Sequence, residues 1–216
     1  MIEARDWYWE LKARNTVSAL NVNGFDAYYE KTVEDAVARI LSCVPSDALV
    51  GLGGSVTLRE MRVPDLLRKR GNRVADHWEA SRNGASPEEV REIRMQHLNS
   101  DVFITSTNAV TEDGQLINVD GGGQRVAAMI YGPKRVIVVT GVNKIAGNID
   151  EGIWRARNVA ASMNAKRLSR KTPCVETGVC GDCDSTDRIC NATTIIHRRP
   201  RDTEIIVILV DEELGY

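Results

Sequence analysis

The sequence predicts an α/β protein built on a mostly parallel β-sheet flanked by helices. Strand-like segments alternate with helix-like segments from about residue 30 to residue 165, which is typical of parallel strands joined by crossover helices. The segment "EIIVILV" (204–210) is apolar on both faces, as expected of a strand inside such a sheet. We expect a helical N-terminal extension (1–27) and one α/β domain (28–216), a size that suits a single domain.

The first third of the chain begins with residues 1–14, which can form a helix. Apolar residues recur at helical spacing in 31–44, which predicts an amphipathic helix. Cys43 lies in that helix and is expected to be a small core residue. A short apolar strand in 47–52 then runs into glycines, and the Ser/Thr-led segment 55–70 is expected to be helical.

The middle of the chain continues the alternation. The segment "NRVADHW" (72–78) is expected to be a second strand. A helix is expected over 86–100, because a serine at its start is a good N-cap and a proline follows in the first turn. Residues 101–123 combine a strand, a polar loop and a hairpin turn at the Glu-Asp-Gly of 112–114.

The last part of the chain is expected to hold a short helix, a long helix and three strands. The short helix follows a glycine turn in 121–145, and the β-branched run at 136–140 predicts the strand that comes after it. The long helix covers 148–168, with its apolar residues on one side. The remaining two strands lie in 192–198 and 204–212.

The composition excludes several classes of protein. The chain is 27% charged and 43% hydrophobic with a formal net charge of −2, so we expect a globular protein that binds neither nucleic acid nor an anionic membrane. No stretch approaches the roughly 18 apolar residues of a transmembrane helix, and the first residues lack the apolar core of a signal peptide. We therefore expect a cytoplasmic protein whose thiols stay reduced.

Three loops rich in Gly, Ser, Thr or Asn follow predicted strands. They are "GLGGS" (51–55), "TSTNAVTEDG" (105–114) and "DGGGQR" (120–125). Ligands of open α/β sheets bind where such loops converge at the strand ends, and glycines allow backbone N–H groups to approach an anion. Neither a dinucleotide fingerprint nor a Walker loop is present. Each loop taken alone is equally consistent with plain turn chemistry, whereas three on one sheet edge favour a pocket.

The candidate site residues come from these loops and their surroundings. Glu112 and Asp120 are candidates for proton transfer, although the first also suits a hairpin turn and the second a helix cap. Lys144 and Arg125 would supply positive charge to an anionic substrate, whereas His77 is expected in a supporting role. The residues expected to bind the substrate are Gly53, Gly54, Ser55, Thr105, Asn108, Gly121, Gly122, Gly123, Arg125 and Asn143.

Four cysteines lie close together in an insert at 172–191, with the spacing C-x5-C-x2-C-x6-C. The central pair has the separation that lets two sulfurs reach one metal or one cluster. An iron–sulfur cluster, a structural zinc ion, two disulfides and a redox dithiol all remain open, and a reducing compartment favours the metal-binding interpretations. The expected ligands are Cys174, Cys180, Cys183 and Cys190, with a 4Fe–4S cluster as the leading cofactor and zinc as the alternative.

The segment "GLGGSVT", the block from "TSTNAVTEDG" to "TGVNKI" and the cysteine-rich tail with "DRICN" resemble the lactate-utilisation (LUD) domain family, which includes the LutC- and YkgG-like proteins. The resemblance runs from about residue 28 to the end of the chain. It implies the fold of the NagB, RpiA and CoA-transferase group, whose members bind ligands with glycine loops at strand ends. It also implies work with iron–sulfur partner subunits in the oxidation of lactate.

The leading hypothesis is a LUD-family redox protein of organic-acid metabolism. It would bind a small anionic metabolite in the glycine-loop pocket and carry an iron–sulfur cluster for electron transfer or structure, as an oxidoreductase component. One alternative is an isomerase- or CoA-transferase-like enzyme with a structural zinc site. Another is a non-catalytic subunit that docks on an iron–sulfur partner through its aromatic N-terminus. The sequence is also compatible with a homo-oligomer.

Overall fold

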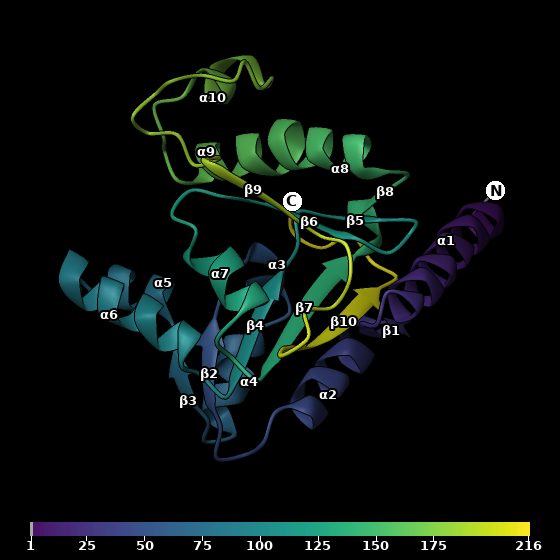
Figure 1. Cartoon of the computed structure of the whole chain (residues 1–216), viewed down its shortest axis with the longest axis horizontal. Coiled ribbons are helices and arrows are strands. Elements are labelled where there is room, and N and C mark those ends of the chain that lie inside the picture. Colours follow the sequence, from purple (N-terminus) through teal and green to yellow (C-terminus); the bar gives the residue numbers. More distant parts are fainter. Residues whose placement is uncertain (1) are drawn as a thin grey trace.

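The computed structural model describes residues 2–216 and contains a six-stranded sheet with helices on both faces (Figure 1). The strand order is β1-β10-β7-β4-β2-β3, and all neighbouring strands are parallel. The predicted α/β class and mostly parallel sheet are therefore confirmed. In sheet order the strands are β1 (Asp26–Glu30), β10 (Glu204–Val210), β7 (Arg135–Gly141), β4 (Val102–Ser106), β2 (Leu49–Leu52) and β3 (Arg73–Ala75).

The central strands bury side chains on both faces of the sheet, as expected from their continuous apolar runs. In β7, Val136 and Val138 pack into one core, whereas Ile137 and Val139 pack into the other. The residues of β10 alternate in the same way between the two cores. The predicted buried strand at 204–210 is confirmed.

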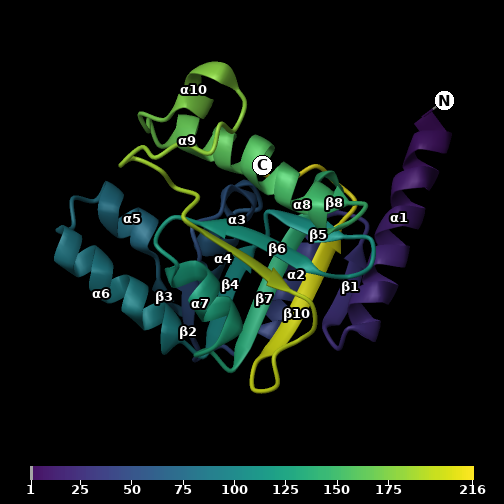
Figure 2. The same cartoon turned by 45° about the horizontal axis from the view of Figure 1, so that its top comes forward.

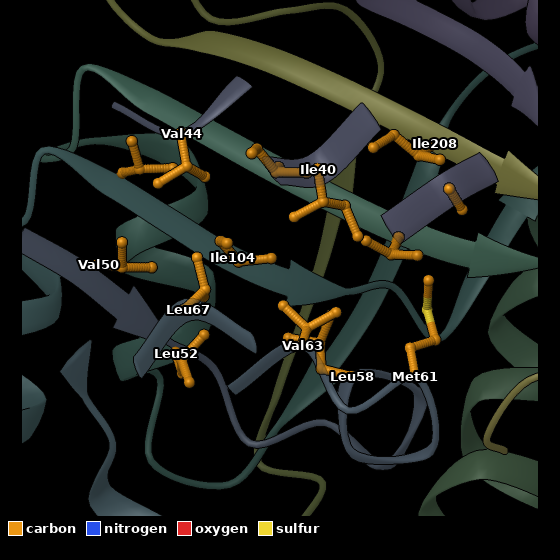
Figure 3. Close-up of a cluster of buried hydrophobic side chains, with 14 of the residues drawn as sticks. Ile40, Val44, Val50, Leu52, Leu58, Met61, Val63, Leu67, Ile104 and Ile208 are labelled. Carbon is orange, nitrogen blue, oxygen red and sulfur yellow. The ribbon is translucent and has the colours of Figure 1, made fainter. Parts of the chain in front are cut away.

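One face of the sheet is covered by α2 (Val33–Cys43), α3 (Val56–Glu60) and α4 (Val63–Lys69), whose apolar side chains interdigitate with those of the strands (Figure 3). The single helix expected over 55–70 is broken into two at Arg62, which has a left-handed φ of 56°. Pro64 in the first turn of α4 explains the break, because proline cannot donate a hydrogen bond to a preceding turn.

The other face is covered by α1 (Ile2–Val22), α7 (Gln124–Ile130) and a second sheet. Helix α1 extends beyond the fourteen residues expected for it and packs along β1 and β10. Ala13 and Leu20 of α1 are fully buried in this second core. The N-terminal helix is thus part of the packing of the sheet.

The second sheet has the order β8-β5-β6-β9, an element that the sequence did not reveal as a separate layer. The predicted hairpin at 112–114 is confirmed: β5 and β6 are antiparallel, and Gly114 adopts a positive φ of 82° in the turn. This hairpin leaves the main sheet after β4, and its two strands pair with β8 and β9 to form the second sheet. The four strands are β5 (Ala109–Thr111), β6 (Leu116–Asp120), β8 (Ile145–Ala146) and β9 (Ala192–Ile196).

A long helical segment lies across the second sheet (Figures 1 and 2). It contains α8 (Ile149–Arg155), a π-helical stretch (Ala156–Ala161) and α9 (Ser162–Arg167), which confirms the long helix expected over 148–168. The short α10 (Pro173–Thr177) follows, and 178–191 have no regular secondary structure. None of the helices in residues 2–216 has the length and apolar character that spanning a membrane requires.

Two further helices border the edge strand β3. The strand expected over 72–78 ends at Ala75, because the Asp76 side chain accepts hydrogen bonds from the N–H groups of Trp78 and Glu79 and thereby caps a helix. The expected helix over 86–100 is confirmed, with a complete capping box at its start. The two helices are α5 (His77–Arg82) and α6 (Pro87–Leu98).

Candidate functional site

A cavity of about 450 Å³ lies beyond the carboxyl ends of β2, β3 and β4. The loops after these strands supply 54–57, 77–78 and 106–108 to its wall. This is the edge where open α/β sheets bind ligands. The third glycine loop, expected at the same sheet edge, reaches the cavity from β6 of the second sheet instead.

The cavity brings together most of the residues expected to form a site. Those that line it are Gly54, Ser55, Asn108, Asp120, Gly121, Gly122, Arg125 and Lys144. Those that do not line it are Gly53, Thr105, Glu112, Gly123 and Asn143.

Lys144 is the most unusual charged group of the cavity, because only 3% of its surface is exposed. It ends the 3-10 turn that follows β7, and its Nζ donates hydrogen bonds of 2.9 Å to Thr57 Oγ1 and to Ser106 Oγ. It forms no ion pair within residues 2–216. Burial, reinforced by the charge of Arg155, lowers the pKa of Lys144 to about 7. Near neutral pH this amine can therefore both accept and donate a proton.

Arg125 and Asp120 form a closed network rather than a free pair of charges. The Arg125 Nε lies 3.3 Å from Asp120 Oδ2, and its Nη atoms donate to the Asn118 and Asn108 side chains at 2.7 Å and 3.2 Å. They also donate to the carbonyl oxygens of Ser106 and Val119. Arg125 thus joins the end of β4 to the second sheet.

The glycines of the third loop serve this same network. Asp120 Oδ1 accepts hydrogen bonds from the N–H groups of Gly122 at 3.1 Å and Gly123 at 2.8 Å. The two amides that the sequence suggested for an anionic ligand therefore already have an anionic partner in Asp120. Gly123 has a left-handed φ of 79° and begins α7.

The first glycine loop is shaped by close approaches of its neighbours. A Cβ atom at Gly53 would lie 2.5 Å from Thr105 Oγ1, and one at Gly54 would lie 2.5 Å from the Trp78 indole nitrogen. Ser55 caps α3 by accepting a hydrogen bond of 3.3 Å from Leu58 N–H. Glycine is required here so that β4 and the Trp78 side chain can pack against the loop.

The remaining candidates hold the loops in place. Thr105 is fully buried, and its hydroxyl donates to the Ser106 carbonyl oxygen at 3.3 Å. Asn143 Oδ1 accepts from Leu214 N–H at 3.1 Å. Glu112 lies in the β5–β6 hairpin, away from the cavity, and its carboxylate pairs with Lys12 of α1 at 2.6 Å.

His77 and Trp78 are cavity residues to which the sequence assigned no catalytic or binding role. His77 is 95% buried, since only 5% of its surface is exposed, and its Nδ1 has no hydrogen-bond partner. Burial, together with the nearby His97 and Arg94, lowers the pKa of His77 to about 4, so the imidazole is neutral at physiological pH. The sequence placed this pair at the end of the strand expected over 72–78, whereas the structure places it at the start of α5, after β3.

The cavity wall also contains four arginines that were not among the candidate site residues. Arg94 comes from α6 and Arg167 from α9, and the Arg167 guanidinium lies 4.2 Å from the centroid of the Trp78 ring. Arg170 lies 3.9 Å from Asp187, and Arg188 pairs with Asp182 at 2.9 Å. Arg167 and Arg170 belong to the basic run 167–171, whereas Arg94 and Arg188 come from distant parts of the chain, so no local pattern could reveal that all four converge.

The four clustered cysteines all line one small hollow of about 20 Å³. Each is partly buried, and all five cysteines of the chain are free thiols. Thr172 Oγ1 lies 3.2 Å from Cys174 Sγ, and burial raises the pKa of the Cys190 thiol. Within residues 2–216, no group of three or more His, Cys, Asp or Glu residues is arranged to hold a metal ion.

The cysteine hollow and the cavity share a wall formed by Ala161, Arg188 and Ile189. The Arg188 side chain donates to the carbonyl oxygens of Cys183 at 2.6 Å and Cys190 at 3.3 Å. Asn191, next to Cys190, donates its backbone N–H to the Asp120 carbonyl oxygen at 3.0 Å and its side-chain amide to that of Gly121 at 3.1 Å. The conformation of the cysteine segment therefore shapes the cavity.

Comparisons with known proteins agree with this architecture. A family model described as "LUD domain" matches residues 13–210. The crystal structure of a DUF162 family protein from Deinococcus radiodurans is similar, with a TM-score of 0.53 and 14% identity over 94% of this chain and 98% of that chain. No curated protein matches the chain. At that identity the structural likeness concerns the fold alone.

Proposed function

The chain belongs to the LUD domain family, and on that premise we propose that it acts in organic-acid metabolism of the lactate-utilisation type. It binds a small anionic metabolite of the hydroxy- or keto-acid class in the cavity. The observation that carries this proposal is the buried, unpaired Lys144 in a wall that also contains five arginines. Two of these arginines, Arg94 and Arg167, have no acidic side chain within 4.0 Å in residues 2–216, so a negatively charged ligand would supply a counter-charge to them and to Lys144.

Lys144 is the proton-transfer residue of this proposal. With a pKa of about 7, a substantial fraction of its amine is neutral at physiological pH and can accept a proton from a hydroxyl or activated carbon of the ligand. The two candidate carboxylates are less suitable. Asp120 is engaged by Arg125 and by two backbone N–H groups, and Glu112 lies away from the cavity against Lys12.

The binding step is tested by isothermal titration calorimetry with small hydroxy and keto acids. Lys144→Met should weaken binding by about tenfold or more, because it removes a charge-assisted contact. Lys134→Met is the matched control, since this exposed lysine precedes the other end of β7. Equal affinities for the native protein and both variants would remove Lys144 from the binding site.

The cofactor part of the proposal concerns the four cysteines. The four cysteines line one hollow but are not arranged to hold a metal ion in this structure, so they would have to move closer together to do so. Four thiolates are the donor set of a 4Fe–4S cluster or of a structural zinc ion, and a bound cluster would supply electron transfer to or from a partner. Metal analysis of anaerobically purified protein tests this assignment. About four irons with four sulfides per chain establish a cluster, one zinc without sulfide establishes the structural ion, and neither metal rejects both.

A second candidate function is an isomerase- or CoA-transferase-type activity, as in the NagB and RpiA group that the sequence resemblance implies. The buried Lys144 favours it, because an amine with a pKa of about 7 can move a proton within the cavity. Proton transfer by Lys144 would then need no redox partner. Turnover by the zinc-containing protein in the absence of any electron donor or acceptor would support this candidate.

A third candidate is a subunit that docks on an iron–sulfur partner protein. The observation that favours it is the exposure of Trp7, Tyr8 and Leu11 together on α1. Replacing Trp7 and Leu11 by serine should abolish such docking without unfolding the chain, since both side chains are exposed. Unchanged co-purification with iron–sulfur subunits would reject this surface as the contact.

A further inference from the structure

The charges that line the cavity are strongly unbalanced. Within residues 2–216, Asp120 supplies the only acidic side chain of the wall, and it is already paired with Arg125. Tyr216 also lines the wall, and its main-chain oxygen accepts a hydrogen bond of 3.3 Å from Arg155. The remaining cations of the wall are Arg94, Lys144, Arg167, Arg170 and Arg188. Arg170 and Arg188 have acidic partners, so a single negative charge would leave two of the other three cations without one.

Three of these cations have no acidic side chain within 4.0 Å anywhere in residues 2–216. They are Arg94, Lys144 and Arg167. Arg188 is only partly compensated, because its partner Asp182 also pairs with Arg157. The uncompensated charge therefore comes from several different elements that surround the same space.

His77 is an independent sign that the cavity is built for a ligand. Its Nδ1 is buried in the cavity wall without a hydrogen-bond partner, and buried polar atoms in proteins are nearly always satisfied. A neutral imidazole nitrogen can form one hydrogen bond with a hydroxyl or an oxygen of a bound molecule. Trp78 beside it is already held by the Arg167 guanidinium.

From these observations we propose that the cavity binds a small organic anion with two or more negative charges, a phosphate ester or a polycarboxylate, in preference to a monoanion such as lactate. This inference rests on the proposed function and names its ligand class. A volume of about 450 Å³ agrees with it, since cavities of roughly 300–1,000 Å³ hold ligands much larger than a three-carbon acid. Arg94 and Arg167 bind one anionic group each, and Lys144 faces the reacting part of the ligand.

The test compares the affinities of four probes at one pH and one ionic strength: lactate, pyruvate, malate and 3-phosphoglycerate. We expect at least one of the last two to bind about tenfold or more tightly than either monoanion. Raising the salt concentration should weaken that binding more than it weakens monoanion binding. A preference for 3-phosphoglycerate would identify a phosphate subsite, and a preference for malate a second carboxylate subsite.

Two variants and their controls locate the subsites. Arg94→Ala and Arg167→Ala should each weaken binding of the preferred anion by about 10- to 100-fold and reduce its advantage over lactate. Arg91→Ala on the same α6 helix and Lys166→Ala on α9 should change neither. All four residues are exposed, but Arg91 and Lys166 do not line the cavity.

The outcomes separate this inference from the proposed function. Lactate or pyruvate binding as tightly as both multiply charged anions would overturn the inference and leave an anionic metabolite site in place. Loss of affinity that is equal for all four probes in Arg94→Ala and Arg167→Ala would also overturn it. No binding of any probe would overturn both the inference and the proposed function.

Discussion

At the scale of single residues, two ionisable side chains are buried, and burial disfavours their charged forms. Lys144 and His77 are 3% and 5% exposed, and burial is the main cause of the lowered pKa of each. Such groups reduce the free energy of unfolding, so a protein retains them where they act on a ligand. Both residues line the same cavity.

Lys144→Met should stabilise the protein at low pH. The amine has a pKa of about 7 in the folded state and an ordinary value of 10.5. Below pH 7 the amine is charged in both states, and burying that charge lowers the free energy of unfolding by the full amount. This loss of stability shrinks as the pH rises from 7 toward 10.5. The free energy of unfolding gained by the variant should be larger at pH 6 than at pH 9 by about 3 kcal/mol. Urea unfolding at the two pH values measures this difference. A gain that does not depend on pH would contradict the lowered pKa.

His77→Gln should make the protein less sensitive to mild acid. The pKa of His77 is about 4 in the folded state and ordinarily 6.5, so its neutral form is required by the fold and stability is lost as the pH falls from 6.5 to 4. This side chain accounts for roughly 2 to 3 kcal/mol of that loss. The melting temperature of the variant should therefore fall less across this range than that of the native protein. His197→Gln, at an exposed position directly after β9, serves as the control.

At the scale of elements, the cavity depends on how the loops after strands pack on one another. The loop after β2 touches the loop after β3, because Gly54 leaves room for the Trp78 ring. Arg125 of α7 joins the end of β4 to β6 through hydrogen bonds to Ser106 and Val119. These contacts place groups from two sheets around one space.

Gly54→Ala should displace the Trp78 ring, whereas Gly122→Ala should not. The new methyl group at Gly54 would lie 2.5 Å from the Trp78 indole nitrogen, so the ring must shift and its contact with Arg167 must change. At Gly122 a methyl group meets nothing within 4 Å. We expect altered tryptophan fluorescence for the first variant only. Equal behaviour of the two variants would show that Trp78 does not shape the cavity.

At the scale of the whole molecule, the cysteine segment and the two sheets meet at the cavity. The segment has little regular structure, and its place is set by contacts such as those of Arg188 with the carbonyl oxygens of Cys183 and Cys190. A group bound by the cysteines would therefore order one wall of the cavity. Binding of the metal group and of the anion should be coupled, and such coupling is reciprocal.

Cys183→Ser should lower both the metal content and the affinity for the anion, whereas Cys43→Ser should change neither. Cys43 lies in α2 on the opposite side of the main sheet, against the first hydrophobic core. Removing the metal group from the native protein with a chelator should weaken anion binding by about 5- to 150-fold, the usual range of coupling between two sites. Calorimetry with and without the chelator measures this factor. An anion affinity that does not change with the metal content would show that the two sites are not coupled.

Part of this architecture follows from local sequence patterns. The buried strand at 204–210, the helix over 86–100 and the hairpin at 112–114 are all confirmed, because periodicity, caps and turn residues act over a few neighbours. The break at Arg62 and the short β3 depended on one proline and one aspartate cap, which are weaker signals. The second sheet was not recognised, because pairing between distant strands leaves no local pattern.

The sequence by itself determined the α/β class, the order of most elements and the LUD family, since these depend on local periodicity and on motifs contiguous in the chain. It also assigned Gly54, Ser55, Asp120 and Lys144 to one pocket, and all four line the cavity. Only the tertiary structure decided which charges remain unpaired there. Arg94 and Arg167 are 73 residues apart, and burial rather than sequence position lowers the pKa of Lys144. The environment of a charge depends on long-range packing, and that packing is what makes this cavity a candidate site for anions.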